Sequence, residues 1–340
     1  MLSKLGSRIK PGAAAFAALV LSASAAHAAD QVSVAMDWIV NGTHAGYFVA
    51  KDKGYYSDAG LDVTISRGFG SGDTVKRVGT GASMFGVADT SAVIAGRSRE
   101  DIPVRIVAMV YGKAPLGIIY LKTANISKPQ DIMGKKIART ASGSSVVMFP
   151  AFLQANNIDR SKIEESVGDA NTLLPMLMSK RVDGVLGQTV NVARYKEAAK
   201  QQNAEVETMN YSDYGLDAYG NSIIAGAAII KDKPDVVSRF VEASLKGIAY
   251  AIQHHDEAVA IIKKAHPETD AVALKEELEA VTPIINTKEA QEKGIGTIAA
   301  VRMKKTTDIV TKVLNLKKSL TVEDVYDPRF QPKKPILAKN

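Results

Sequence analysis

The sequence predicts an α/β protein with two lobes, each a sheet flanked by helices, joined by a two-strand hinge. Strand-like and helix-like segments alternate from residue 32 onward, which is typical of βαβ units and parallel sheets. Two such alternating sets follow one another, and extended apolar runs near 115–121 and 219–226 bracket the second set. Two strands that join two α/β lobes form a hinge, and we expect a cleft between the lobes.

The first set predicts one sheet with helices between its strands. Apolar runs that predict strands lie at 32–36, 62–65, 84–88 and 104–110. Helical patterns lie between them at 45–56, 73–81 and 90–97. Residues 29–117 are therefore expected to form the first part of the first lobe.

The second set has the same organisation, and the chain then returns to the first lobe. Strands are predicted at 116–121, 135–139 and 184–187, with helices at 146–157 and 192–202. An extended run at 217–230 crosses back, and the sequence after it is almost entirely helical, with Asp232 expected as an N-cap and Pro234 in the first turn. The expected division is 118–221 for the second lobe and 222–340 for the return to the first.

The first 28 residues predict a secretory signal peptide. A basic start with Lys4, Arg8 and Lys10 precedes a short apolar run and the small-residue pattern that ends at Ala28. We expect cleavage near Ala28 and export to the periplasm, with a retained membrane anchor as the alternative. The absence of cysteine is compatible with export, because a mature chain of this length can bury a large core without disulfides.

Composition and motifs argue against several function classes. The formal charge is +7, and removal of the three basic residues of the signal peptide leaves 40 basic against 36 acidic residues. Aromatic residues make up only 6% and are not interleaved with the basic runs, so no nucleic-acid partner is expected. Nucleophile-elbow, zinc-protease, P-loop and Rossmann motifs are missing. We expect no catalytic residues, no metal and no cofactor, and a monomer.

Short hydrogen-bonding side chains follow four of the predicted strands, two in each lobe. In open α/β sheets, ligands bind outside the carboxyl ends of the strands, so these side chains are candidate ligand-binding residues. The candidates are Trp38, Asn41, His44, Asp89, Ser142, Ser144, Gln188 and Asn191, with Tyr219 as a second aromatic wall.

Each candidate also has a structural interpretation. For Ser142, Ser144 and Asp89 the structural alternative is that each caps the N-terminus of a helix and does not contact the ligand. Trp38 can be a core residue, although its place after a strand favours a ring-stacking wall. His44 has no acidic or histidine partner at metal-ligand spacing, so a structural or hydrogen-bonding role is expected for it. Asp89 separates two ligand classes if it faces the cleft, because a carboxylate repels an anion and accepts hydrogen bonds from amino groups.

Five segments of the chain carry a resemblance to a known family: "MDWIVNGTHAGYFVAKDKGYYSDAGLDVTI" at 36–65, and the stretches at 85–97, 132–138, 173–187 and 213–225. On these segments the chain resembles the periplasmic solute-binding proteins of ABC importers, in the thiamine-pyrimidine, sulfonate and nitrate-binding (NMT1/THI5-like) family. It implies a type II periplasmic binding protein that captures a small molecule between its lobes and delivers it to a permease in the inner membrane.

The resemblance leaves the ligand open. A thiamine-precursor aminopyrimidine or a similar flat heterocycle is the first expectation. A small anion (alkanesulfonate, aromatic carboxylate or nitrate), held by "SGSS" at 142–145 and Arg139, is the alternative, and a secreted enzyme of pyrimidine metabolism is a remote one. The resemblance implies that fungal synthases carry a lysine and a histidine in the segment that corresponds to 86–92, which reads "GVADTSA" here, and cysteines further on, whereas this chain has no cysteine. Pyrimidine binders of the family carry a glutamate after the strand at 184–187, where this chain has no acid before Glu197.

Overall fold

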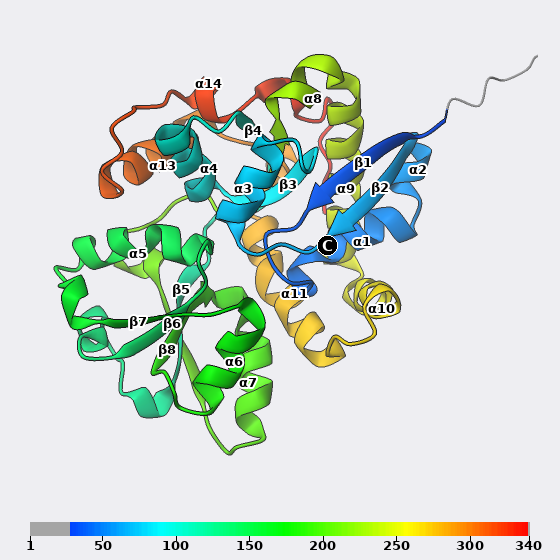
Figure 1. The fold of residues 1–340 in the computed structure, drawn as a ribbon. Coiled ribbons are helices and arrows are strands. Elements are labelled where there is room, and N and C mark those ends of the chain that lie inside the picture. Colours follow the sequence, from blue (N-terminus) through cyan, green and yellow to red (C-terminus); the bar gives the residue numbers. More distant parts are fainter. Residues whose placement is uncertain (1–27, 339–340) are drawn as a thin grey trace, which may run out of the picture.

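The computed structural model describes residues 28–338, and within them two five-stranded sheets form two lobes (Figure 1). The sheet of the first lobe has the order β2-β1-β3-β10-β4, and that of the second has the order β7-β6-β8-β5-β9. The strands are β1 (Asp30–Ala35), β2 (Leu61–Ser66), β3 (Phe85–Asp89), β4 (Val104–Met109), β5 (Leu116–Leu121), β6 (Lys136–Arg139), β7 (Glu164–Val167), β8 (Gly184–Gln188), β9 (Val206–Asn210) and β10 (Asn221–Gly226). The predicted α/β architecture with two lobes is confirmed.

Helices flank both sheets. Helices α5–α7 belong to the second lobe and the others to the first (Figure 1). They are α1 (Ala45–Asp52), α2 (Tyr55–Asp58), α3 (Ser71–Gly79), α4 (Thr90–Glu100), α5 (Ser144–Ala155), α6 (Ala170–Met178), α7 (Ala193–Lys200), α8 (Ala227–Asp232), α9 (Pro234–Gln253), α10 (His255–Ala265), α11 (Ala271–Ile285), α12 (Lys288–Lys293), α13 (Ala300–Val313) and α14 (Val322–Val325). The prediction of Asp232 as an N-cap is wrong, since Asp232 ends α8 and Lys233 takes the N-cap position of α9.

The sheets are mixed, whereas strand–helix alternation predicted parallel ones. Strand β10 runs antiparallel to β3 and β4, and β5 runs antiparallel to β8 and β9. These two strands are the ones that directly follow a crossing between the lobes. Each of them enters its sheet from the hinge side. Strands that follow a flanking helix enter from the opposite side, so the two kinds of strand run in opposite directions.

The chain crosses between the lobes through residues 110–115 and 211–220, outside the strands. The two crossing segments are hydrogen-bonded to each other, from Ala114 N to Ala218 O at 2.9 Å and from Gly220 N to Tyr111 O at 3.0 Å. The predicted lobe boundaries at 117/118 and 221/222 therefore lie next to these segments, just inside β5 and β10.

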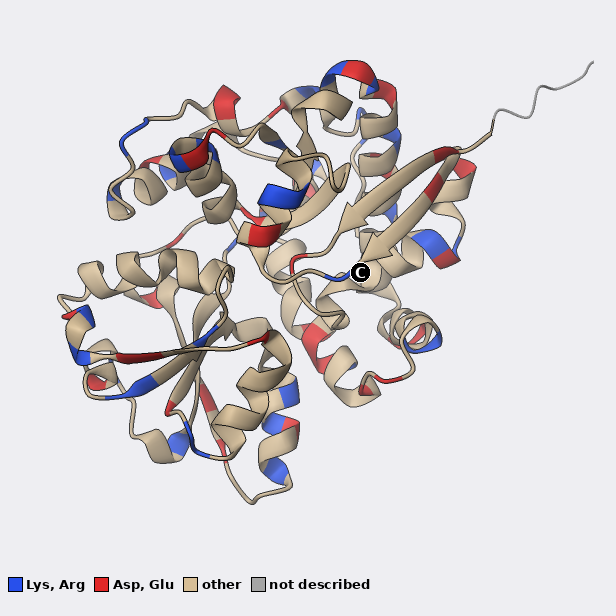
Figure 2. Cartoon of the chain, viewed as in Figure 1, with Lys and Arg blue, Asp and Glu red and all other residues tan. Residues whose placement is uncertain are grey.

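The signal-peptide prediction concerns residues 1–28, which, apart from Ala28, lie outside the described residues. None of the helices within 28–338 combines the length and the apolarity needed to span a bilayer. Lysine, arginine, aspartate and glutamate alternate over the outer helices and loops of both lobes (Figure 2).

Helices α1 and α9 pack so closely that two glycines are required at their crossing. A Cβ atom on Gly46 would lie 2.4 Å from Ile248 Cγ1, and one on Gly247 would lie 2.2 Å from Gly46 O. We expect Gly46→Ala to lower the free energy of unfolding by about 2 kcal/mol, because the backbones must separate to admit a methyl group. Urea unfolding measures this, with Ser238→Ala on the exposed face of α9 as the control. Equal stability of the two variants would contradict the close packing.

Candidate functional site

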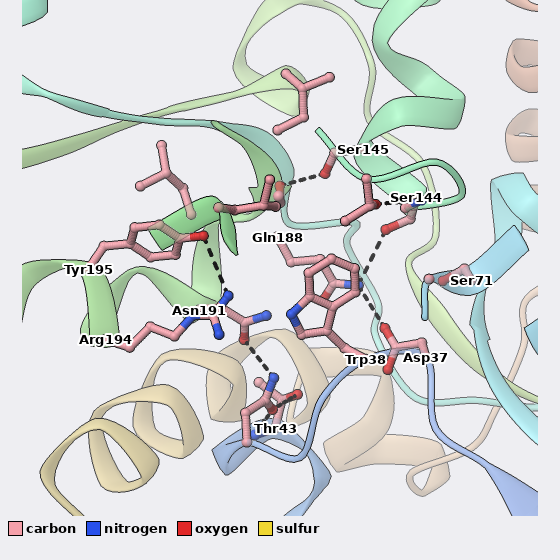
Figure 3. A pocket seen from close by; sticks show the side chains of 18 residues that line it. Asp37, Trp38, Thr43, Ser71, Ser144, Ser145, Gln188, Asn191, Arg194 and Tyr195 are labelled. Carbon is pink, nitrogen blue, oxygen red and sulfur yellow. Dashed lines mark hydrogen bonds between the residues drawn. The ribbon is translucent and has the colours of Figure 1, made fainter. Parts of the chain in front are cut away.

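A cleft between the lobes collects the polar residues that follow strands β1 and β8 (Figure 3). The first lobe contributes the loop after β1 and the start of α3, and the second contributes the start of α5, the end of β8 and the start of α7. Five of the nine predicted residues lie in its lining: Trp38, Asn41, Ser144, Gln188 and Asn191.

Asp37 is the central carboxylate of this cleft. It is only 5% exposed. Its Oδ1 lies 2.9 Å from His44 Nε2, and its Oδ2 accepts hydrogen bonds from Gln188 Nε2 at 3.1 Å and Asn221 Nδ2 at 2.9 Å. Gln188 belongs to the second lobe, so this carboxylate links the two lobes (Figure 3).

Sequence reasoning missed Asp37, although it directly follows the first predicted strand. The available signal was positional, because Asp37 occupies the carboxyl end of β1. His44, which was predicted to contact the ligand or to serve a structural role, lies behind Asp37, outside the cleft lining, and is 1% exposed.

Asn41 organises the loop that carries these residues. Its Oδ1 accepts hydrogen bonds from Thr43 N at 2.9 Å and Thr43 Oγ1 at 2.7 Å, which caps the short 3₁₀ helix η1 (Gly42–His44). Its Nδ2 reaches Asn191 Oδ1 of the second lobe at 3.4 Å. One amide therefore fixes the loop locally and also contacts the opposite wall of the cleft.

Trp38 extends from the first lobe onto the second. Its ring is partly buried and packs against an apolar cluster of the second lobe that includes Ile119 and Leu173. In Figure 3 the indole lies in the middle of the cleft, between Gln188 and Asn191. Any change in the separation of the lobes alters the surroundings of this ring.

The second lobe lines the cleft with the start of α5. Thr140 Oγ1 accepts a hydrogen bond from Gly143 N at 3.1 Å, and Ser145 Oγ donates to Gly187 O at 2.5 Å, which joins α5 to β8. Ser144 Oγ lies 3.5 Å from Gln188 Nε2. Ser142, the remaining candidate here, donates to Phe69 O at 2.9 Å across the lobe boundary and lies outside the cleft lining.

Asp89 and Tyr219 lie apart from this cleft, on a small cavity next to the crossing segments. Asp89 caps α4 by accepting from Ser91 N at 2.9 Å, and its Oδ2 is buried with no hydrogen-bond partner among the described residues. Burial raises the pKa of Asp89 to about 6. Tyr219 packs in the core, and its hydroxyl accepts from Ala299 N at 3.2 Å. The geometry thus assigns both a structural environment.

Arg139, expected to hold an anion, faces away from the cleft lining and pairs with Glu165 of β7. Residues that the sequence did not single out line the cleft instead: Thr43, Ser71, Thr140, Arg194 and Tyr195. Arg194 and Tyr195 follow Asn191 by three and four positions, so the start of α7 brings them to the same side.

A second buried carboxylate, that of Glu277 on α11, borders the loop after β1. Its Oε2 accepts a hydrogen bond from Gly42 N at 2.9 Å. Burial raises the pKa of Glu277 to about 7, while the bond from Gly42 and the positive charge of Arg194 act in the opposite direction. Within the described residues, no group of three or more acidic or histidine side chains is arranged to hold a metal ion.

The cleft is narrow between its polar walls, with about 30 Å³ of space. That is room for about two water molecules. A cavity of about 510 Å³ adjoins it, and the two share Asn41 and Arg194 in their linings.

The sequence and the fold both match known proteins. The family model described as "NMT1/THI5 like" matches residues 41–258. The chain is 26% identical to a formylaminopyrimidine-binding protein of Halalkalibacterium halodurans over 75% of this chain and 76% of that one. It is 24% identical to the riboflavin-binding protein RibY of Chloroflexus aurantiacus over 89% and 86%. Other relatives are named as 4-amino-5-hydroxymethyl-2-methylpyrimidine phosphate synthases.

Solved structures show the same fold. The alkanesulfonate-binding protein SsuA of Xanthomonas axonopodis pv. citri, bound to MOPS, superposes with a TM-score of 0.68 at 11% identity, over 87% of this chain and 98% of that one. The fold is therefore that of periplasmic binding proteins, as predicted. Because the family model matches well over half of the sequence, the chain belongs to the NMT1/THI5-like family.

Proposed function

We propose that this protein is the solute-binding component of an ABC importer and that it captures a small planar heterocycle bearing amino groups. The observation that carries the proposal is the Asp37 carboxylate, which lies in the cleft between the lobes beside the ring of Trp38. A carboxylate accepts hydrogen bonds from ring amino groups and repels an anion. The relatives named for binding a pyrimidine and a flavin support a flat, nitrogen-rich ligand.

Pyrimidine binders of the family are expected to carry a glutamate after β8, whereas this chain has Gln188 at the end of that strand and no acid before Glu197. Gln188 donates to Asp37, so the acidic group of the cleft comes from the first lobe and the amide from the second. Asp37 then offers one acceptor for a ligand amino group, and Gln188 offers one donor for a ring nitrogen or carbonyl. This arrangement compensates for the missing acid.

Binding is proposed to favour the closed arrangement of the lobes. Ligand that contacts both walls stabilises the closed state more than the open one, so the population shifts toward closure. The narrow cleft requires the lobes to part, or Gln188 and Asn191 to swing away, before a ring can enter. Closure then signals occupancy to a permease in the inner membrane. The signal-peptide pattern at 1–28 supports a periplasmic location.

The alternative ligand is a small anion at the start of α5, supported by the likeness in fold to an alkanesulfonate-binding protein. Thermal unfolding of the mature chain separates the two classes, because a ligand that binds the native state raises the midpoint. We expect aminopyrimidines to raise it and alkanesulfonates and nitrate to leave it unchanged. Trp38, the single tryptophan, should change its emission with the same ligands. If only the anions raised the midpoint, the proposal of a heterocyclic ligand would be wrong.

A further inference from the structure

The cavity beside the cleft has the volume that the cleft lacks. We define the side cavity by Ile39, Val40, Arg67, Arg194, Leu274 and Glu277, which line it together with the loop between α10 and α11. Its 510 Å³ lies within the usual range of ligand sites, about 300–1,000 Å³. Both lobes contribute to its wall, since Arg67 follows β2 and Arg194 lies on α7.

The side cavity adjoins the cleft at two residues. Asn41 and Arg194 line both spaces, and Asn41 Nδ2 meets Asn191 Oδ1 at the boundary. That contact is long, at 3.4 Å, so it is a weak barrier. Once the Asn41–Asn191 contact parts, a group attached to a ring in the cleft can extend past Asn41 into the side cavity.

Two guanidinium groups in the side cavity have buried N–H groups without acceptors. Arg67 Nη2 and Arg194 Nε are buried and have no hydrogen-bond partner among the described residues. Neither arginine forms an ion pair within residues 28–338. Arg67 stacks over Phe69 at 4.5 Å, and Arg194 over Tyr195 at 5.1 Å, which holds both groups in place. Buried donors without partners are costly, so these positions favour an incoming acceptor.

Each acidic group of the side cavity already has a partner for one of its two carboxylate oxygens. Glu277 accepts from Gly42 N, Asp270 Oδ1 accepts from Ala273 N at 2.8 Å, and Glu268 pairs with His266 at 3.1 Å. The buried donors without partners in this wall are thus those of the arginines, and Ile39, Val40 and Leu274 add apolar surface beside the polar Asn41, Asn171 and Thr269. An oxygen-bearing chain fits this combination better than an amine does.

We propose that the ligand carries an oxygen-rich substituent, a phosphate ester or a hydroxylated chain, which occupies the side cavity and accepts hydrogen bonds from Arg67 and Arg194. This inference rests on the proposed function, because the ring to which the substituent is attached occupies the cleft. It narrows the ligand class from any small heterocycle to a heterocycle with an acceptor-rich arm.

Two matched pairs of probes test the substituent. One is 4-amino-5-hydroxymethyl-2-methylpyrimidine and its phosphate ester, and the other is lumiflavin and riboflavin, which differ by the hydroxylated chain. Calorimetric titration of the mature protein is expected to show that at least one arm-bearing compound binds about tenfold more tightly than its partner, which corresponds to one charge-assisted hydrogen bond. A gain for the phosphate that weakens with salt indicates charge, and a salt-insensitive gain for riboflavin indicates hydroxyl groups.

Arg67→Met and Arg194→Met, which keep the length of the side chains, should both reduce that gain to within about threefold. Arg67 lines only the side cavity, so the arm-free probes should bind to Arg67→Met as before, whereas Arg194 also lines the cleft and its variant is judged by the gain within each pair alone. Arg181→Met, at an exposed arginine outside both spaces, is the control and should retain the full gain. Equal binding within both pairs, or a gain that survives in the two arginine variants, would overturn the inference and leave the proposed function standing. Failure of all four probes would overturn both.

Discussion

Asp37→Asn is expected to weaken the binding of an aminopyrimidine by about 30-fold to 100-fold, or about 2–3 kcal/mol. The carboxylate accepts from His44, Gln188 and Asn221, and an amide in its place has a single acceptor oxygen. Its NH₂ group would face donors instead of accepting from them. Calorimetric titration with the ligands that stabilise the wild type measures the loss.

The control for this variant is Asp62→Asn, an exposed aspartate of the same lobe whose Oδ2 accepts from Gln31 at 3.0 Å. It should bind ligand as the wild type does. Thermal unfolding without ligand shows whether the Asp37 variant keeps its fold. If a folded Asp37→Asn protein bound the aminopyrimidine with unchanged affinity, Asp37 would not contact the ligand. The carboxylate would then serve only to orient His44, Gln188 and Asn221.

Asp89 is expected to make the protein less stable as the pH rises from about 4 to about 6. Its pKa is 3.8 in the unfolded chain and about 6 in the folded one, where burial disfavours the charge. Between these values the folded state binds more protons than the unfolded state, so deprotonation opposes folding. The shift corresponds to a loss of about 3 kcal/mol that is complete above pH 6. Asp89→Asn cannot titrate and should remove this part of the pH dependence.

Urea unfolding of the wild type and of Asp89→Asn at pH 4 and pH 7 measures the effect. The free energy of unfolding lost between the two pH values should be larger for the wild type than for the variant. Asp159 is a matched control, because its Oδ1 also accepts from the N and Oγ of the serine two residues on, but at an exposed site. Those hydrogen bonds hold the pKa of Asp159 below its usual value, so Asp159→Asn should leave the loss between pH 4 and pH 7 in place. Parallel pH profiles for wild type and Asp89→Asn would show that the Asp89 carboxyl has access to water.

The local elements were predictable because they depend on short-range patterns. The apolar run at 116–121 was predicted with the same bounds as β5, and the runs at 62–65 and 104–110 agree with β2 and β4 to within one residue at either end. Strands β7 and β9 were not predicted. β7 carries Glu164 and Glu165 among its four residues and is an edge strand, so it lacks the apolar run that marks a central strand.

The cleft was partly predictable from the rule that ligands bind at the carboxyl ends of strands. That rule located Asn41 and Trp38 after β1, and Gln188 and Asn191 after β8. It failed to exclude Asp89, which also follows a strand. Asp89 lies beside β10 in the sheet, and its pairing with Asn221 turns it toward the crossing segments.

The sequence by itself determined the two α/β sets, the two crossings and the family, because each depends on the order of residues along the chain. Only the tertiary structure decided which polar side chains meet. Asp37 and Gln188 are 151 positions apart, and Asn41 and Asn191 are 150 apart, so no local pattern relates them. Their contacts arise from the packing of one lobe against the other. The same packing buries His44 behind Asp37 and brings Arg67 and Arg194, each with a buried N–H group that has no partner among the described residues, to the wall of one cavity.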